Sequence, residues 1–323
     1  MKKTILNFTR QLNWDPEASG KIQNKNCKKV IICGMGGSHL GADILKMLDL
    51  KFEILVHKNY GLPNLNLEEL KKSLIILDSY SGNTEEVISS FLEAQKLNLN
   101  FIIIASGGKL IELAKKFKKP YIQIPYTGIQ PRHALGFQIL ALLYALNLNN
   151  LILDIKKISS KINILNLEKK GKILAKELKN TVPIIYASQK NEALAYNWKI
   201  KFNETSKIPA FYNVFPELNH NEMQGMDVMP NTKELSKNFY FLMFYDENDY
   251  SKIKTRMKIT NKLYLKRGLK TKILNLNEKN IWLKIFNNLL LGDWTSYYLS
   301  QIYKTEPEQV PMVEEFKKII SLI

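Results

Sequence analysis

The chain has 323 residues, 45% of them hydrophobic, which is enough for two domains with substantial cores. Its net charge of +17 comes from lysines spread along the whole chain, so the charge does not indicate a nucleic-acid-binding block. No apolar stretch approaches the length of a membrane span, and Met1-Lys2-Lys3 does not begin a signal peptide, so we expect a cytoplasmic protein without a membrane partner.

From about residue 28, short apolar runs alternate with amphipathic stretches, which is the pattern of a doubly wound parallel sheet. The predicted strands are 29–33, 52–57, 74–78, 101–105 and 121–125. The predicted helices are 40–50, 85–97, 110–117 and 133–146. We therefore expect a first α/β domain over residues 1–150.

The second half repeats the alternation. The segment 147–154 leads into a charged helix over 156–179, which predicts a domain boundary near residue 150. Strands are then predicted at 183–187, 239–245 and 271–274, and helices at 192–202, 251–266, 280–303 and 313–320. The stretch 208–232 has no helical or strand period, and long ordered loops of this kind tend to be functional. The sequence thus predicts a second α/β domain over residues 151–323.

Two loops of the first half have the composition of an anion site. Gly34-Met35-Gly36-Gly37-Ser38 follows the first strand, and Ser79-Tyr80-Ser81-Gly82-Asn83-Thr84 follows the third. Each loop enters a helix, where free backbone N–H groups and the helix dipole favour negative charge. Helix capping by Thr84 is the plainer interpretation, but it does not account for three hydroxyls in one turn. We predict that both loops bind one phosphate group.

Other ligands are less well supported by the residues. A dinucleotide fingerprint would need a third glycine where His39 stands and an acidic residue near His57. A metal site could use Glu217, His220 and Glu222, but one histidine is few for zinc or iron. We therefore expect no bound metal and no nicotinamide cofactor.

Two side chains could perform acid–base chemistry, and a third could stabilise negative charge. Glu204 ends a predicted helix and His220 lies in the long loop, and a carboxylate with an imidazole can form an acid–base pair. A solvated surface carboxylate is the alternative for Glu204. Arg132, one of only four arginines, follows Pro131, and its planar guanidinium can hold an enolate-like oxygen in fixed geometry.

Taken in order, the motifs resemble the bifunctional phosphoglucose/phosphomannose isomerases, two-domain members of the sugar isomerase (SIS) superfamily. The resemblance extends over most of the chain. Besides the two loops, it is carried by Ser106-Gly107-Gly108-Lys109-Leu110, Pro131-Arg132, Asn203-Glu204, Pro216-Glu217-Leu218-Asn219-His220-Asn221-Glu222, Gly292-Asp293 and Ser296.

The resemblance implies two flavodoxin-like SIS subdomains, a homodimer, and catalysis without a metal or organic cofactor. The substrate would be a sugar phosphate, with glucose 6-phosphate and mannose 6-phosphate interconverted with fructose 6-phosphate. By the same resemblance the phosphate site falls on Gly37, Ser38, Ser79, Ser81 and Thr84.

The remaining roles also follow from the resemblance. Glu204 would be the base, His220 would open the sugar ring in its own or a partner's site, and Arg132 would stabilise the enediolate. Thr295 or Ser296 would admit mannose phosphate, although hydrogen bonding within their own helix would also explain these hydroxyls.

Two alternatives to this isomerase remain. A non-catalytic SIS module could sense a sugar phosphate, and an amino-sugar isomerase or deaminase could use the same pocket. His39 is larger than the residue usual in the family after the phosphate loop, which bears on substrate range.

Overall fold

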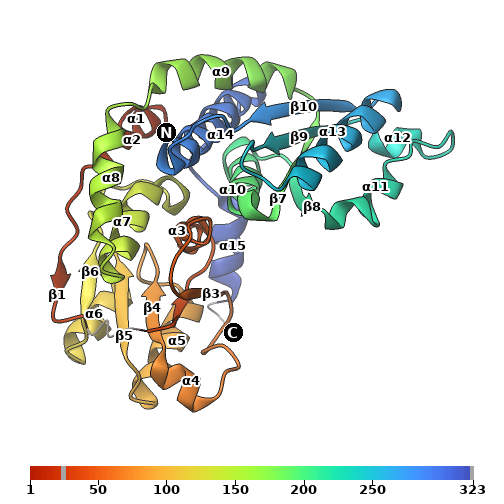
Figure 1. Cartoon of the computed structure of the whole chain (residues 1–323). Coiled ribbons are helices and arrows are strands. Elements are labelled where there is room, and N and C mark those ends of the chain that lie inside the picture. Colours follow the sequence, from red (N-terminus) through yellow and green to blue (C-terminus); the bar gives the residue numbers. More distant parts are fainter. Residues whose placement is uncertain (23–26, 321–323) are drawn as a thin grey trace. The chain divides into compact units, whose positions relative to one another are not determined.

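The computed structural model describes residues 1–22 and 27–320. The chain divides into two compact units (Figure 1). The first unit is Leu6–Ile162, and the second unit is Asn163–Ile323 together with Met1–Ile5. The division falls after Ile162, and helix α8 (Asn149–Ser159) packs against helix α7 (Leu135–Ala145) of the first unit.

The first unit contains a six-stranded sheet in the order β1-β6-β5-β4-β2-β3. All neighbouring strands are parallel except β1, which pairs antiparallel with β6 at the edge. The order of β2 to β6 is that of a flavodoxin-like sheet. The strands are β1 (Ala18–Ser19), β2 (Lys29–Cys33), β3 (Glu53–His57), β4 (Leu74–Asp78), β5 (Phe101–Ala105) and β6 (Tyr121–Gln123).

Alternate residues of a strand point to opposite faces of the sheet, and β4 and β5 are buried at every position, so helices cover both faces. Ile75 and Leu77 of β4 pack with α5 (Glu85–Lys96) and α6 (Gly108–Lys116) in one core. Helix α7 contacts β5 and α3. The other helices of the unit are α2 (Phe8–Gln11), α3 (Leu40–Leu45), α4 (Leu67–Lys72) and α8.

The second unit contains a four-stranded, fully parallel sheet in the order β10-β9-β7-β8. Its strands are β7 (Val182–Ser188), β8 (Phe211–Phe215), β9 (Phe239–Tyr245) and β10 (Lys270–Asn275). Its helices are α1 (Lys2–Leu6), α9 (Ile164–Glu177), α10 (Glu192–Lys201), α11 (Glu222–Gly225), α12 (Lys233–Ser236), α13 (Ser251–Lys266), α14 (Ile281–Tyr303) and α15 (Pro311–Ile320).

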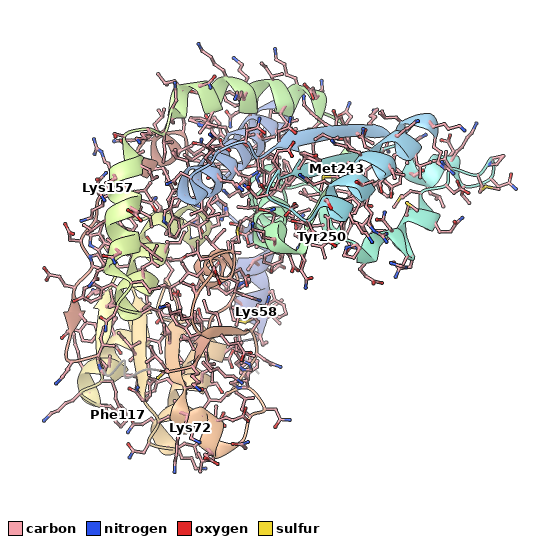
Figure 2. All side chains as sticks on the ribbon, viewed as in Figure 1. Lys58, Lys72, Phe117, Lys157, Met243 and Tyr250 are labelled. Carbon is pink, nitrogen blue, oxygen red and sulfur yellow. The ribbon has the colours of Figure 1, made fainter. Side chains whose placement is uncertain are left out.

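The two faces of this second sheet carry different helices. Met243 of β9, labelled in Figure 2, packs with Met257 and Tyr264 of α13 in one core. The next residue, Phe244, points to the other face and lies edge-on to Trp198 of α10, with ring centroids 5.1 Å apart. Helix α10 in turn packs against α14, so α13 covers one face and α10 with α14 the other.

The predicted α/β fold class, with a parallel sheet in each half, is confirmed. The predicted helix over 156–179 is wrong, since α8 ends at Ser159 and α9 begins at Ile164. The stretch 208–232, predicted to be irregular, contains the edge strand β8. Among the described residues, no helix combines the length and the apolarity needed to cross a membrane.

Exposed lysines of the first unit come from separate segments. Lys58, Lys72 and Lys157, labelled in Figure 2, come from three separate segments and are all exposed.

Candidate active site

The first sheet has a topological switch point between β2 and β4. These neighbouring strands are followed by the loops 34–38 and 79–84, while β3 lies on one side of the pair and β5 on the other. In open α/β sheets, ligands bind in the crevice outside the carboxyl ends of the strands at this point. The two loops predicted to bind phosphate therefore lie where this fold places a ligand.

Hydrogen bonds between hydroxyls and backbone join the two loops. The Ser38 Oγ accepts from the Tyr80 N–H at 2.9 Å, which links the first loop to the second. Within the second loop the Ser79 Oγ lies 2.7 Å from the Thr84 Oγ1 and accepts from the Gly82 N–H at 3.1 Å. Ser38 and Ser79 are buried, whereas Ser81 is exposed on the rim. The structure thus brings Ser38, Ser79 and Thr84 together.

A third loop closes on the second. The Ser106 Oγ donates to the Tyr80 carbonyl at 2.6 Å, and the Leu110 N–H donates to the Gly82 carbonyl at 2.9 Å. Gly82 has a φ of +71°, and a Cβ there would lie 1.8 Å from the Gly107 carbonyl oxygen. Only glycine fits both the backbone conformation and this close approach.

Arg132 lies beside the first loop. It is buried in a single 3₁₀ turn, Pro131–His133, at the start of α7. A Cβ on Gly37 would lie 2.7 Å from the Pro131 Cβ and 2.8 Å from the Arg132 nitrogen, so the loop and the turn are in contact. The predicted residues Gly37 and Arg132 are therefore neighbours. His39, the next residue after Ser38, is also buried, and its Nδ1 lies 2.7 Å from the Asp43 Oδ2.

Asp78, the last residue of β4, is an acid that the sequence analysis did not consider. It is fully buried, and neither carboxyl oxygen has a hydrogen-bond partner among the described residues. Burial raises the pKa of Asp78 well above its usual value, because the charged form would lose its hydration. The signal in the sequence was an aspartate at the end of an otherwise apolar run.

In the second unit, Glu204 lies on a π-helical turn, Phe202–Ser206, that continues α10. The turn ends at Lys207, which has a left-handed φ of +58° and whose Nζ donates to the Glu204 carbonyl. The Asn203 side chain donates to the Ile208 carbonyl at 3.0 Å. Single π-helical turns and left-handed residues other than glycine are frequent at functional sites. The sequence predicted only the end of a regular helix here.

Helix α14 packs against this turn. The Ser206 Oγ donates to the Ser296 carbonyl at 2.9 Å. The Thr295 Oγ1 donates to the Leu291 carbonyl at 2.7 Å and the Ser296 Oγ to the Asp293 carbonyl at 3.1 Å, so both hydroxyls bond within their own helix. Both candidate specificity residues thus lie on the helix that contacts the turn of Glu204.

The structure separates Glu204 from His220 within one chain. Glu204 precedes β8 and its turn packs on α14, whereas His220 follows β8, beyond the 3₁₀ turn Glu217–Asn219. At about 3.3 Å per residue, the strand alone sets its two ends more than ~10 Å apart. Asn219, next to His220, contacts α13, on the other face of the sheet. The two side chains are therefore not brought together as an acid–base pair in one chain.

The candidate metal ligands do not form a cluster. Glu222 accepts hydrogen bonds from the Tyr186 hydroxyl at 2.5 Å and from the Asn213 side chain, and Glu217 accepts from the Asn221 amide at 3.2 Å. In the part of the chain that the structure describes, no group of three or more His, Cys, Asp or Glu side chains could hold a metal ion.

The switch point of the second sheet, between β7 and β9, holds a buried ion pair. The Lys284 Nζ lies 2.6 Å from the Asp246 Oδ2, and both residues are buried. Asn191 also donates to the Asp246 carboxylate, and Ser188 donates to Asp249 at 2.8 Å. Burial acts to raise the pKa of Asp246, but the hydrogen bond and charge of Lys284 leave it below the usual value. This cluster was not predicted from the sequence.

Comparison with known proteins identifies the family. Over 321 residues the chain is 33% identical to the bifunctional phosphoglucose/phosphomannose isomerase of Aquifex aeolicus (strain VF5), covering 98% of this chain and 97% of that protein. The chain belongs to the bifunctional phosphoglucose/phosphomannose isomerase family. The predicted resemblance is thereby confirmed.

Other comparisons agree with this family. The member from Caldicellulosiruptor bescii is also 33% identical, over 100% of this chain and 99% of its own length. Residues 167–320 match the family described as "Bacterial phospho-glucose isomerase C-terminal SIS domain". A solved structure, a hypothetical protein from Thermus thermophilus, has the same fold with a TM-score of 0.73 at 14% identity, covering 99% of this chain and 87% of that one.

Proposed function

We propose that this family member is an enzyme, an aldose–ketose isomerase that interconverts glucose 6-phosphate, and also mannose 6-phosphate, with fructose 6-phosphate. The observation that carries the proposal is the hydroxyl-lined switch point of the first sheet, in a chain that is similar over nearly its full length to curated isomerases of these sugars. A monoester phosphate matches the hydroxyls and backbone N–H groups of that crevice.

In this proposal the first unit holds the phosphate and stabilises charge. Gly37, Ser38, Ser79, Ser81 and Thr84 bind the phosphate group. Arg132, which adjoins Gly37, stabilises the negative charge that develops on the enediolate oxygens. A preorganised cation of this kind can contribute about 3 kcal/mol to transition-state stabilisation.

The second unit supplies the proton transfers. Glu204 takes the proton from C2 of the open-chain aldose and returns it to C1 through a cis-enediolate, so one carboxylate serves both steps. Return of a proton to either face of C2 in the reverse direction yields the glucose or the mannose epimer. Thr295 or Ser296 leaves room for the second epimer, and His220 moves the proton that opens the sugar ring.

The separation of Glu204 from His220 along β8 supports a homodimer in which His220 acts in the partner's site. We therefore propose composite sites, and retain the cytoplasm as the compartment. Mixing two inactive variants tests the composite site. A heterodimer of Glu204→Gln and His220→Asn chains keeps one intact site if His220 acts across the dimer, so activity returns on mixing. Sites made within one chain would each carry a defect, and mixing would restore nothing.

Turnover of fructose 6-phosphate by the purified protein, assayed with and without a chelator, tests the function itself. We expect activity in both conditions, and a loss on chelation would point to a metal. Glu204→Gln should lower turnover about 100-fold or more while the sugar phosphate still binds, because only the proton-transfer group is removed. A non-catalytic sensor would instead bind the sugar phosphate without turnover in every variant.

A further inference from the structure

His220 lies in a short segment whose side chains are anchored on both sides of it. The segment consists of one 3₁₀ turn, Glu217–Asn219, and the one-turn helix α11, which begins at Glu222. His220 itself is exposed, and its backbone N–H donates to the Glu217 carbonyl at 2.9 Å. Such short turns have little stability of their own, so other contacts must set the position of the imidazole.

The first anchor is Glu222, two residues after His220. One carboxylate oxygen accepts from the Tyr186 hydroxyl at 2.5 Å, and the other accepts from the Asn213 side chain. Tyr186 and Asn213 are partners in register on the adjacent strands β7 and β8. The carboxylate is therefore held by two donors that the sheet itself places side by side.

Tyr186 is well suited to this contact because it is fully buried and always a donor. Burial, together with the nearby Tyr264 and Glu222, raises the pKa of Tyr186 far above its usual value. The hydroxyl of Tyr264 lies 3.4 Å from that of Tyr186, in the same core. Tyr264 has no hydrogen bond to Glu222 in the part of the chain described, which makes it a natural control.

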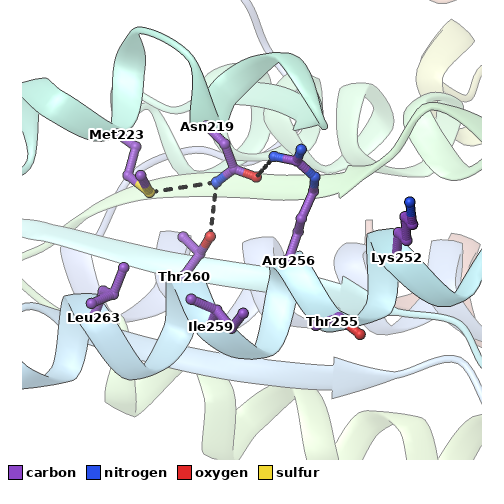
Figure 3. Close-up of a pocket in the computed structure, with 8 residues that line it drawn as sticks. All are labelled: Asn219, Met223, Lys252, Thr255, Arg256, Ile259, Thr260 and Leu263. Atoms are coloured by element: carbon purple, nitrogen blue, oxygen red, sulfur yellow. Dashed lines mark hydrogen bonds between the residues drawn. The ribbon is translucent and has the colours of Figure 1, made fainter.

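The second anchor is Asn219, directly before His220 (Figure 3). Its amide donates to the Thr260 Oγ1 of α13 at 2.8 Å, and its carbonyl oxygen accepts from Arg256 at 3.5 Å. Thr260 is buried, so this contact is fixed to the core of the unit. The contacts lie in an open pocket of about 440 Å³ that α13 and the His220 segment line together. Thr255, which also lines it, bonds only to the Ser251 carbonyl of its own helix among the hydrogen bonds described.

We propose that Tyr186 and Thr260 are positioning residues for His220, acting through Glu222 and Asn219. The inference rests on the proposed ring-opening role of His220. General acid–base transfer requires the imidazole to lie within hydrogen-bond reach of the sugar oxygens, and a displacement of about 1 Å can cost up to about 100-fold in rate. Loosening either anchor should therefore impair ring opening and leave the C1–C2 proton transfer by Glu204 intact.

A substrate that cannot form a ring separates these two steps. 5-Deoxyfructose 6-phosphate lacks the hydroxyl that closes the furanose ring, and its C6 oxygen is blocked by phosphate. Both this compound and fructose 6-phosphate take up deuterium at C1 when an enediolate forms in D₂O, which NMR can follow. Turnover of the acyclic compound needs Glu204 but not ring opening.

We expect Tyr186→Phe and Thr260→Val to slow deuterium uptake into fructose 6-phosphate about 10-fold, and to change uptake into the acyclic compound less than twofold. His220→Asn should show the same selectivity more strongly. The matched controls are Tyr264→Phe and Thr255→Val, which remove a hydroxyl from the same core and the same pocket; among the hydrogen bonds described, neither hydroxyl bonds to Glu222 or Asn219. They should match the wild type on both substrates.

The outcomes distinguish failure of the proposed function from failure of the positioning role. Absence of uptake by the wild type, or a His220→Asn variant without selectivity, overturns the proposed function or the role of His220. A selective His220→Asn with Tyr186→Phe and Thr260→Val that slow both substrates equally, or neither, overturns the positioning role alone. If Tyr186→Phe fails to fold, Thr260→Val on the opposite side of His220 still decides the question.

Discussion

Replacing Gly82 with alanine tests whether the close approach of two loops builds the phosphate site. The new Cβ would lie 1.8 Å from the Gly107 carbonyl oxygen, whereas ordinary van der Waals contact begins at about 3.4 Å. The neighbour is backbone and not a flexible side chain, so the two loops must separate. The left-handed φ of +71° adds strain of about 1–2 kcal/mol for any residue with a Cβ.

Gly128 provides a matched control for this strain. It also has a φ of +71°, but a Cβ there would meet nothing within 4 Å. Gly128→Ala should therefore cost only the backbone strain, whereas Gly82→Ala adds about 1–3 kcal/mol of overpacking and displaces the hydroxyls of its loop. We expect Gly82→Ala to weaken binding of inorganic phosphate at least about 10-fold, measured by calorimetric titration, with Gly128→Ala unchanged. Equal affinities in the two variants would refute the assignment of the site to these loops.

Two buried charges give further predictions. Lys284→Met should lower the free energy of unfolding of the second unit by about 3–5 kcal/mol at pH 7, because Asp246 keeps its charge without the ammonium that neutralises it. The lowered pKa of Asp246 contributes stability that is complete above its unfolded value of about 3.9 and is lost as pH falls through the lower folded value, so the deficit, followed by hydrogen exchange, should shrink below about pH 4. In the first unit, the raised pKa of Asp78 means that stability is lost as pH rises through the range above about 3.9. Asp78→Asn should therefore gain more stability over the wild type in urea unfolding at pH 8 than at pH 4, and a constant difference would contradict the buried, protonated state.

The strands of the first sheet could be predicted because each is a short apolar run bounded by polar loops. Residues 29–33, 74–78 and 101–105 were predicted with the bounds that the structure has. Strand β8 was missed because an edge strand with intermediate burial has no strong apolar pattern, and Asn213 and Pro216 suggested a loop. One long helix was predicted over 156–179 because the charge pattern does not reveal the break between Ser159 and Ile164, where the structure has two helices.

The candidate site was predictable only where its residues are adjacent in sequence. Loops 34–38 and 79–84 can be recognised from their glycine and hydroxyl residues. They lie side by side because β2 and β4, which precede them, are neighbours in the sheet. The π-helical turn at Glu204 depends on packing against α14, and the contact of Tyr186 with Glu222 depends on strand register, so neither has a local signal. The separation of Glu204 from His220 also required the three-dimensional fold.

The ion pair of Asp246 and Lys284 makes the two sheets unequal, although β7 to β10 follow the same strand order as β2 to β5. In the second sheet the Lys284 ammonium and the Asp246 carboxylate neutralise each other at the crevice. The charge of Lys284 is therefore neutralised by Asp246 and is not available to an incoming anion. The same strand order therefore ends in a hydroxyl-lined crevice in the first sheet and in a neutralised ion pair in the second.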